Sequence, residues 1–283
     1  MTAVAPIAVR RTRAVRLRPR SGLALVVVSA VGLVAFCWPL LVEPGSGLDG
    51  SATAPWLFVA LLPLLLAVVL AEVADGGLDV KSVAVLGVLA AVGAALRPLG
   101  GGAAGFEPVF FLLVLAGRAL GPGFGLVLGS VTLFASALLT AGVGPWLPFQ
   151  MLAAGWVGFL AGCLPPARGR AEVVLLAAYG AVAGLLYGLL MNLQLWPFAT
   201  GLESGLSYVA GDPLGDNLGR FLAFTLATSM GFDIPRAVTT AVLVAVTARP
   251  VLLALRRAAR KAEFGAVGEF AAAAPRRPDG TAG

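Results

Sequence analysis

The chain has 283 residues, of which 59% are hydrophobic and 12% are charged, and it contains no histidine. A typical soluble domain carries roughly 25% charged residues, whereas repeated apolar runs near twenty residues are typical of a polytopic membrane protein. The absence of histidine excludes His-based metal sites, Ser-His-Asp triads and histidine proton relays. Neither Lys81 nor Lys261 follows a glycine, so no Walker-type nucleotide loop is present.

The N-terminal segment 1–21 is basic, with six arginines and no acidic residue. The apolar run 22–42 that follows is longer than the apolar core of a signal peptide, and no small-residue cleavage site comes after it. We therefore predict an uncleaved span that begins on the cytoplasmic side. Cys37 and Cys163 both fall within apolar runs, so we expect no disulfide framework.

The hydropathy pattern predicts an all-α integral membrane protein with about eight crossings. A short span at 107–118 is expected to be tilted or sheltered by its neighbours, and Pro235 suits the first turn of the last helix. The predicted crossings cover residues 22–42, 55–73, 82–96, 107–118, 124–141, 148–164, 173–191 and 234–255. The expected organisation is a basic segment (1–21), two extra helices (22–81), a six-helix domain (82–257) and a disordered cytoplasmic tail (258–283).

Positive charge sets the expected orientation in a plasma membrane. Eight crossings place both termini on one side, and with that side cytoplasmic only Arg97, Arg220 and Arg236 lie at the outer face. This distribution follows the positive-inside rule, so the net charge of +6 does not indicate nucleic-acid binding.

The stretch GVGPWLPFQM (142–151) has two prolines, a tryptophan and a glutamine between two apolar runs. Each proline removes a backbone donor and clashes with the preceding turn, so an ordinary mid-span helix is excluded. Irregular backbone at membrane depth occurs only where protein or a water-filled cavity satisfies it. The stretch is therefore an external turn or the wall of a polar cavity, and its expected position at the outer face favours the cavity wall.

The polar residues at the outer ends of the spans allow two interpretations. Arg236 could simply pair with Asp233 or Asp216 at the interface. Alternatively, an outward-facing pocket gathers polar groups from several spans, with Trp146 as an aromatic wall, whereas Trp156 and Trp196 are expected to be interfacial anchors. The candidate substrate-binding residues are Arg97, Glu107, Trp146, Gln150, Asn192, Asp233 and Arg236.

The third predicted span carries Gly87, Ala91 and Ala95 at four-residue spacing. Small residues at this spacing let a second helix approach closely, either from within the same chain or from a partner. The glycines within 117–129 are expected to serve close helix packing and a tight turn, because no strand precedes them as a phosphate-binding loop would require.

Four segments resemble the substrate-binding S subunits of energy-coupling factor (ECF) vitamin transporters, over roughly residues 82–257. The most specific is GPWLPFQM, because generic membrane packing does not call for that order of residues. The segments are ALRPLG (95–100), EPVFFLLVLAGRALGPGFGLVLG (107–129), GPWLPFQMLAAGWVGFLAG (144–162) and SMGFDIPRA (229–237).

This resemblance implies a six-helix membrane subunit that captures a vitamin or related micronutrient from outside, here most similar to the cobalamin branch. It also implies a transmembrane coupling subunit and two cytoplasmic ATPases as partners, with ATP used by those partners and no cofactor bound directly. In the family, a small-residue face on the first of the six helices docks onto the coupling subunit, and the matching residues here are Gly87, Ala91 and Ala95.

The chain departs from the family pattern at Ala137, Val143 and Leu147, where relatives often have asparagine, glutamine and threonine, and at Phe232, where they often have tryptophan. Fewer side-chain donors favour a different or more apolar cargo. The alternatives are a membrane enzyme acting on a lipid or isoprenoid, for which no DxxxD metal pair is present, and a structural protein. A structural protein would leave the polar residues at the outer span ends without a purpose.

Overall fold

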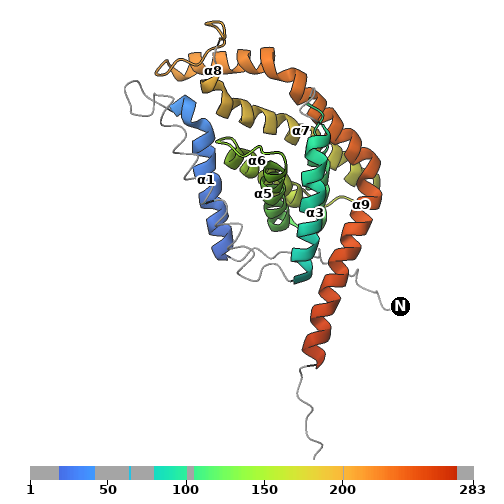
Figure 1. The fold of residues 1–283 in the computed structure, drawn as a ribbon. Helices are drawn as coiled ribbons and strands as arrows, with labels where there is room; N and C mark the ends of the chain where they lie inside the picture. Colours follow the sequence, from blue (N-terminus) through green and yellow to red (C-terminus); the bar gives the residue numbers. More distant parts are fainter. Residues whose placement is uncertain (1–18, 42–63, 65–79, 101–104, 200, 273–283) are drawn as a thin grey trace, which may run out of the picture.

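The structure is a computed structural model that describes residues 19–41, 64, 80–100, 105–199 and 201–272. Every regular element among these residues is helical, which confirms the predicted all-α class. The α-helices are α1 (Pro19–Leu41), α3 (Val80–Leu99), α4 (Val109–Leu120), α5 (Pro122–Leu139), α6 (Leu147–Cys163), α7 (Gly169–Leu195), α8 (Leu214–Phe224) and α9 (Met230–Ala272). Figure 1 shows α5 and α6 inside a frame formed by α1, α3, α7 and α9.

Among the described residues, four segments are long and apolar enough to cross a membrane: Val80–Leu99, Pro122–Leu139, Gly169–Phe198 and Leu214–Arg260. Three shorter apolar helices, at Leu25–Leu41, Val109–Leu120 and Leu147–Cys163, accompany them. The predicted span at 55–73 lies outside the described residues, so the number of eight crossings stays a prediction.

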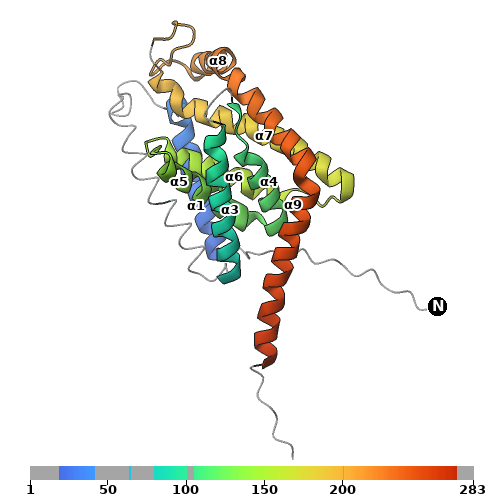
Figure 2. The same ribbon diagram turned by 45° about the vertical axis from the view of Figure 1, so that its right-hand side comes forward.

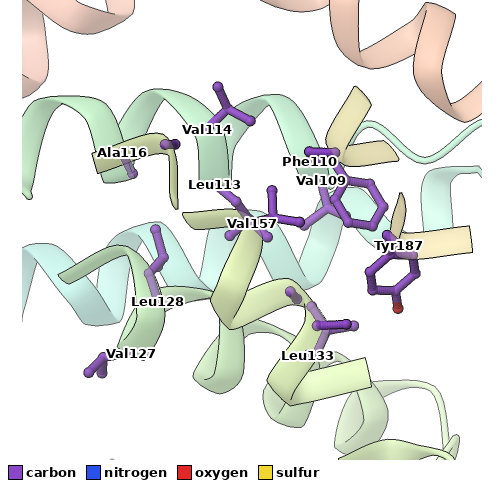
Figure 3. Packing of buried hydrophobic residues seen from close by; sticks show 14 of the residues in the cluster. Val109, Phe110, Leu113, Val114, Ala116, Val127, Leu128, Leu133, Val157 and Tyr187 are labelled. Atoms are coloured by element: carbon purple, nitrogen blue, oxygen red, sulfur yellow. The ribbon is translucent and has the colours of Figure 1, made fainter. Parts of the chain in front are cut away.

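Helix α4 is short but enclosed by other helices. All of its residues except Phe111 and Arg118 are buried, which agrees with the expected shelter. Figure 3 shows its apolar side chains beside those of α5, α6 and α7, and the Phe110 ring meets the Tyr187 ring edge-on with centroids 4.7 Å apart. A helix of 12 residues can therefore stand in the middle of the bundle, because neighbouring helices rather than lipid surround it.

Glycine contacts hold α4, α5 and α6 together. A Cβ added to Gly117 would lie 2.0 Å from the Gly158 carbonyl oxygen, and one added to Gly125 would lie 2.3 Å from that same atom. Gly129 approaches the Ala154 carbonyl in the same way, and Gly121 turns the chain between α4 and α5 with a φ of 103°. The predicted role of these glycines in packing and turning is confirmed.

The GVGPWLPFQM stretch divides into a turn and the start of a helix. Residues 140–146 form the turn, where Ala141 has a φ of 51°, and α6 begins at Leu147. Pro148 falls in the first turn of α6, where the backbone N–H it lacks would have no intrahelical partner. The stretch therefore ends one span and places Gln150 in the first turns of the next.

Helix α1 packs against α6 through aromatic contacts. The Phe36 ring lies edge-on to the Phe149 ring with centroids 4.8 Å apart, and the Trp156 indole N–H donates a hydrogen bond to Ser29 at 2.9 Å.

The interpretation of Trp196 as an interfacial anchor is wrong, because its side chain is fully buried and its indole N–H donates to the Leu206 carbonyl at 2.7 Å.

The C-terminal helices differ from the prediction in two respects. A π-helical segment, Thr225–Ser229, joins α8 to α9, so α9 starts at Met230 and Pro235 lies inside it rather than in its first turn. The helix also continues to Ala272, through much of the segment that was expected to be disordered, because residues 256–263 (RRAARKAE) are mostly strong helix formers. Figure 2 shows α9 extending past the other helices.

Candidate functional site

Four of the predicted site residues form one hydrogen-bonded network. It lies where α7 ends and α9 begins, at the end of the bundle that we call the site end. The Arg236 guanidinium on α9 donates from Nε to Glu107 Oε2 at 2.9 Å and forms a second ion pair with Asp233. The Asn192 amide on α7 donates to Asp233 Oδ2 at 3.4 Å. Residues more than a hundred positions apart in sequence thus meet, because α7 and α9 pack together and the loop before α4 reaches α9.

Close backbone contacts fix the position of this network. Gly188 lies against the Asp233 carboxylate, since a Cβ there would come within 2.0 Å of Oδ1. Gly105, with a φ of 74°, lies against the Phe232 carbonyl and brings the segment that carries Glu107 onto α9. A side chain at either glycine would separate the elements that hold the two acids.

Tyr187 forms an aromatic floor beneath the network. Its ring is buried, and the Arg236 guanidinium lies over it with 5.4 Å between the guanidinium carbon and the ring centroid. The positive charge is thus satisfied by two carboxylates and an aromatic face, which is how ionisable groups are tolerated at membrane depth.

A second polar group lies where α3 ends and α6 begins. The Arg97 guanidinium donates a hydrogen bond to Gln150 Oε1 at 2.9 Å, so two predicted site residues 53 positions apart are in direct contact. Among the described residues, Arg97 has no acidic side chain within salt-bridge distance. A Cβ on Gly100 would lie 1.7 Å from the Phe106 carbonyl oxygen, so the end of α3 that carries Arg97 lies against the segment that carries Glu107, and both polar groups are at the site end.

Trp146 does not join either group. Its side chain is 45% exposed, its ring lies over Gly144, and its indole N–H donates to the Gly142 carbonyl at 3.2 Å. The side chain is therefore held within its own turn, and it has no ring contact with another described aromatic residue. Its role as a cavity wall stays a prediction.

The opposite end of the bundle carries a different cluster. Glu172 on α7 is buried and accepts hydrogen bonds from Arg118 Nε at 2.7 Å and from Arg256 Nη2 at 2.7 Å. Arg118 also donates to the carbonyl groups of Leu164, Pro165 and Ala167.

Arg220, the remaining arginine predicted at the outer face, is not part of this cluster. It pairs with Asp212 at 2.6 Å and thus joins α8 to the loop before it.

The small-residue stripe lies on the exposed face of α3. Gly87, Ala91 and Ala95 are all exposed, and no atom lies within 4 Å of a Cβ built on Gly87. Ala90 and Ala94, on the other face of α3, are buried against the bundle. Internal packing therefore uses the neighbouring alanines, and the stripe faces away from the described residues.

Two residues of the site were not found from the sequence. Tyr187 and Gly188 lie in a long apolar run, where a tyrosine and a glycine give no sign of function before the packing of α7 on α9 is known. The described residues contain no group of three His, Cys, Asp or Glu side chains arranged to hold a metal ion.

The fold and site define a class: a multi-pass helical membrane protein with polar residues gathered at one end of an apolar bundle. The chain belongs to the family of ECF transporter substrate-specific components, whose profile matches residues 81–254, more than half of the chain. No curated protein and no solved structure matches the chain. Members of this family generally work with a transmembrane coupling subunit and ATPases.

Proposed function

We propose that this chain captures a vitamin or related micronutrient from outside the plasma membrane for ATP-driven import, with a cobalamin-type cargo favoured. The observation that carries the proposal is Arg97, a half-buried cation at the site end that contacts Gln150 and has no acidic partner among the described residues. Ionisable residues in membrane spans tend to face a cavity or a substrate pathway, so a guanidinium with unused donors at this position is a candidate ligand contact.

The arrangement of the polar residues supports ligand capture rather than a covalent reaction. The Arg236 network and the Arg97–Gln150 pair are placed by α3, α6, α7, α9 and the loop before α4, and they lie among largely apolar surroundings. A few fixed polar groups in an apolar setting are typical of small-molecule sites. The orientation that places this end outside rests on the arginine distribution, and the cobalamin preference rests on the resemblance of GPWLPFQM.

The exposed stripe on α3 supports a docking role. Gly87, Ala91 and Ala95 present a face without large side chains, on which a helix of a transmembrane coupling subunit fits closely. Two cytoplasmic ATPases would then drive transport through that subunit, and this chain would bind no ATP itself.

The proposal is tested by equilibrium binding of cyanocobalamin to the purified protein in detergent or nanodiscs. We expect saturable binding, together with co-purification of a coupling subunit and ATPases from the native membrane. Turnover of a lipid by a protein that retains no small molecule would contradict the proposal and favour a membrane enzyme.

A further inference from the structure

Helix α8 has three chemically distinct sides. The side that packs on the bundle carries buried residues: Asn217, Phe221 and Phe224. A second side is charged, with exposed Asp216 and half-buried Arg220. The third side carries a row of exposed leucines at four-residue spacing, which we call the leucine row: Leu214, Leu218 and Leu222 on α8, and Leu226 in the π-helical segment that follows.

The leucine row and the charged side point in nearly opposite directions. Residues two positions apart on a helix are about 160° apart around its axis, so Leu218 points away from both Asp216 and Arg220. Two glycines lie beside the leucines, and a Cβ built on Gly215 or on Gly219 would have no atom within 4 Å. The flank of α8 that carries the leucine row is therefore open.

The length of the segment that contains α8 requires part of it to lie outside the membrane crossing. Leu214–Arg260 has 47 residues, and a helix of that length would measure about 70 Å, whereas the hydrocarbon core of a bilayer is about 30 Å thick. With 11 residues, α8 alone is about 16 Å long and too short to cross. Figures 1 and 2 show α8 lying across the site end of the bundle, whereas α9 runs down its side.

The leucine row leads into the exposed apolar side of α9. Ile234 comes eight residues after Leu226, and it begins a second exposed row at four-residue spacing. The members of this row are Ile234, Val238, Val242 and Val246. They belong to the part of the chain that is apolar enough to cross a membrane, so lipid is expected to cover them. The same lipid is therefore available to the leucines of α8.

We infer that α8 is an in-plane interfacial helix, whose leucine row inserts among lipid acyl chains while Asp216 and Arg220 face water. A helix with leucines on one side and charged residues on the other lies in this way at a membrane surface. The π-helical segment Thr225–Ser229 is then the place where the chain turns from the interface into the crossing. The inference concerns the membrane and is independent of the cargo.

The test uses spin labels attached to single cysteines in protein reconstituted into phosphatidylcholine nanodiscs. The native cysteines, Cys37 and Cys163, are first replaced by alanine. Electron paramagnetic resonance then measures how often each label collides with oxygen, which is enriched in lipid, and with a water-soluble nickel chelate. Labels at Leu218→Cys and Leu222→Cys should favour oxygen. The label at Asp216→Cys, on the opposite side of the same helix, should collide with the nickel chelate several-fold more often.

Val242→Cys on α9 is the reference for a lipid-facing position, and the leucine-row labels should match it in oxygen collisions. A variant with a lowered melting temperature is replaced by Leu214→Cys, the first member of the row. Leucine-row labels that the nickel chelate reaches as readily as the label at Asp216→Cys place the row in water and overturn the inference. Labels that neither reagent reaches show that protein covers the row, from a second copy or from another segment of this chain, and overturn it as well.

Discussion

The two ends of the helical bundle both contain buried arginines, but the arginines are satisfied differently. At the opposite end, Arg118 contacts Glu172 and three backbone carbonyl groups, and Glu172 also contacts Arg256. At the site end, Arg236 is paired with two acids, whereas the Arg97 side chain hydrogen-bonds, within the described part of the chain, to the neutral amide of Gln150 alone. The guanidinium of Arg118 is thus saturated with protein partners, whereas the guanidinium of Arg97 has donors left for a ligand.

This difference predicts that the Glu172 cluster contributes to the stability of the fold and that Arg97 contributes to ligand binding. Breaking a saturated buried cluster leaves a charge without its partner and weakens the fold. Removing a side chain whose donors are still unused should leave the fold almost unchanged and weaken only what binds to it. Substitutions at the two ends should therefore change different measured quantities.

The largest effect on stability is expected for Glu172→Gln, which leaves the buried Arg118 guanidinium without a counter-ion. Breaking a buried ion pair costs about 3–5 kcal/mol, so thermal unfolding in detergent should show a large decrease in melting temperature. Asp212→Asn is the control, because its pair with Arg220 is partly exposed and worth about 1 kcal/mol or less. Equal shifts for the two variants would show that the Glu172 cluster is not a structural anchor.

A smaller loss of stability is expected for Gly188→Ala. Its Cβ would lie 2.0 Å from Asp233 Oδ1, so α7 and α9 must separate or the carboxylate must move. Overpacking of this kind costs about 1–3 kcal/mol, and it should also weaken cyanocobalamin binding because Asp233 leaves Arg236. Gly219→Ala on α8 has no atom near the added Cβ and should be neutral. Unchanged stability and affinity in Gly188→Ala would contradict the assigned geometry.

Arg97→Ala should have little effect on stability and a clear effect on binding. A hydrogen bond to a charged group contributes about 1.5–3 kcal/mol, so affinity for cyanocobalamin should fall about tenfold or more. Arg220→Ala removes another partly buried arginine of the same chain and should leave the affinity unchanged. A similar loss in both variants would indicate a general charge effect instead of a site.

The smallest effect on the isolated chain is expected for Ala91→Leu combined with Ala95→Leu. Both residues are exposed on α3, so stability and cyanocobalamin affinity should not change. Recovery of the coupling subunit in a pull-down should be lost, because leucine side chains prevent close approach of a partner helix. Ala178→Leu on the exposed face of α7 is the control. Normal recovery of the coupling subunit by the double variant would remove the docking role of the stripe.

The sequence predicted the parts of the fold that depend on local chemistry. The prolines of 142–151 required a break between spans, and the structure has a turn followed by a helix that starts with Pro148 in its first turn. The glycines of 117–129 lie where helix backbones meet. These features follow from backbone geometry that each residue type imposes on its own position.

The missed features depend on packing between distant segments. Gly188 matters because Asp233, on another helix, lies against it, and Tyr187 matters because Arg236 lies over its ring. The start of α9 was placed too late, since nothing in residues 225–229 reveals that a π-helical segment continues one helix into the next. The six polar candidates fall into two groups, the Arg236 network and the Arg97–Gln150 pair, whereas the contacts of Trp146 stay within its own turn; their role in binding stays a prediction.

The most direct test of the central claim is native mass spectrometry of the parent protein, Arg97→Ala and Glu172→Gln after mild purification from the native membrane. The account predicts that the parent retains a small organic molecule, that Arg97→Ala loses it while staying folded, and that Glu172→Gln retains it in whatever fraction stays folded. A parent without any bound molecule, or an Arg97→Ala variant that retains as much as the parent, would contradict the assignment of the site end as the place of capture.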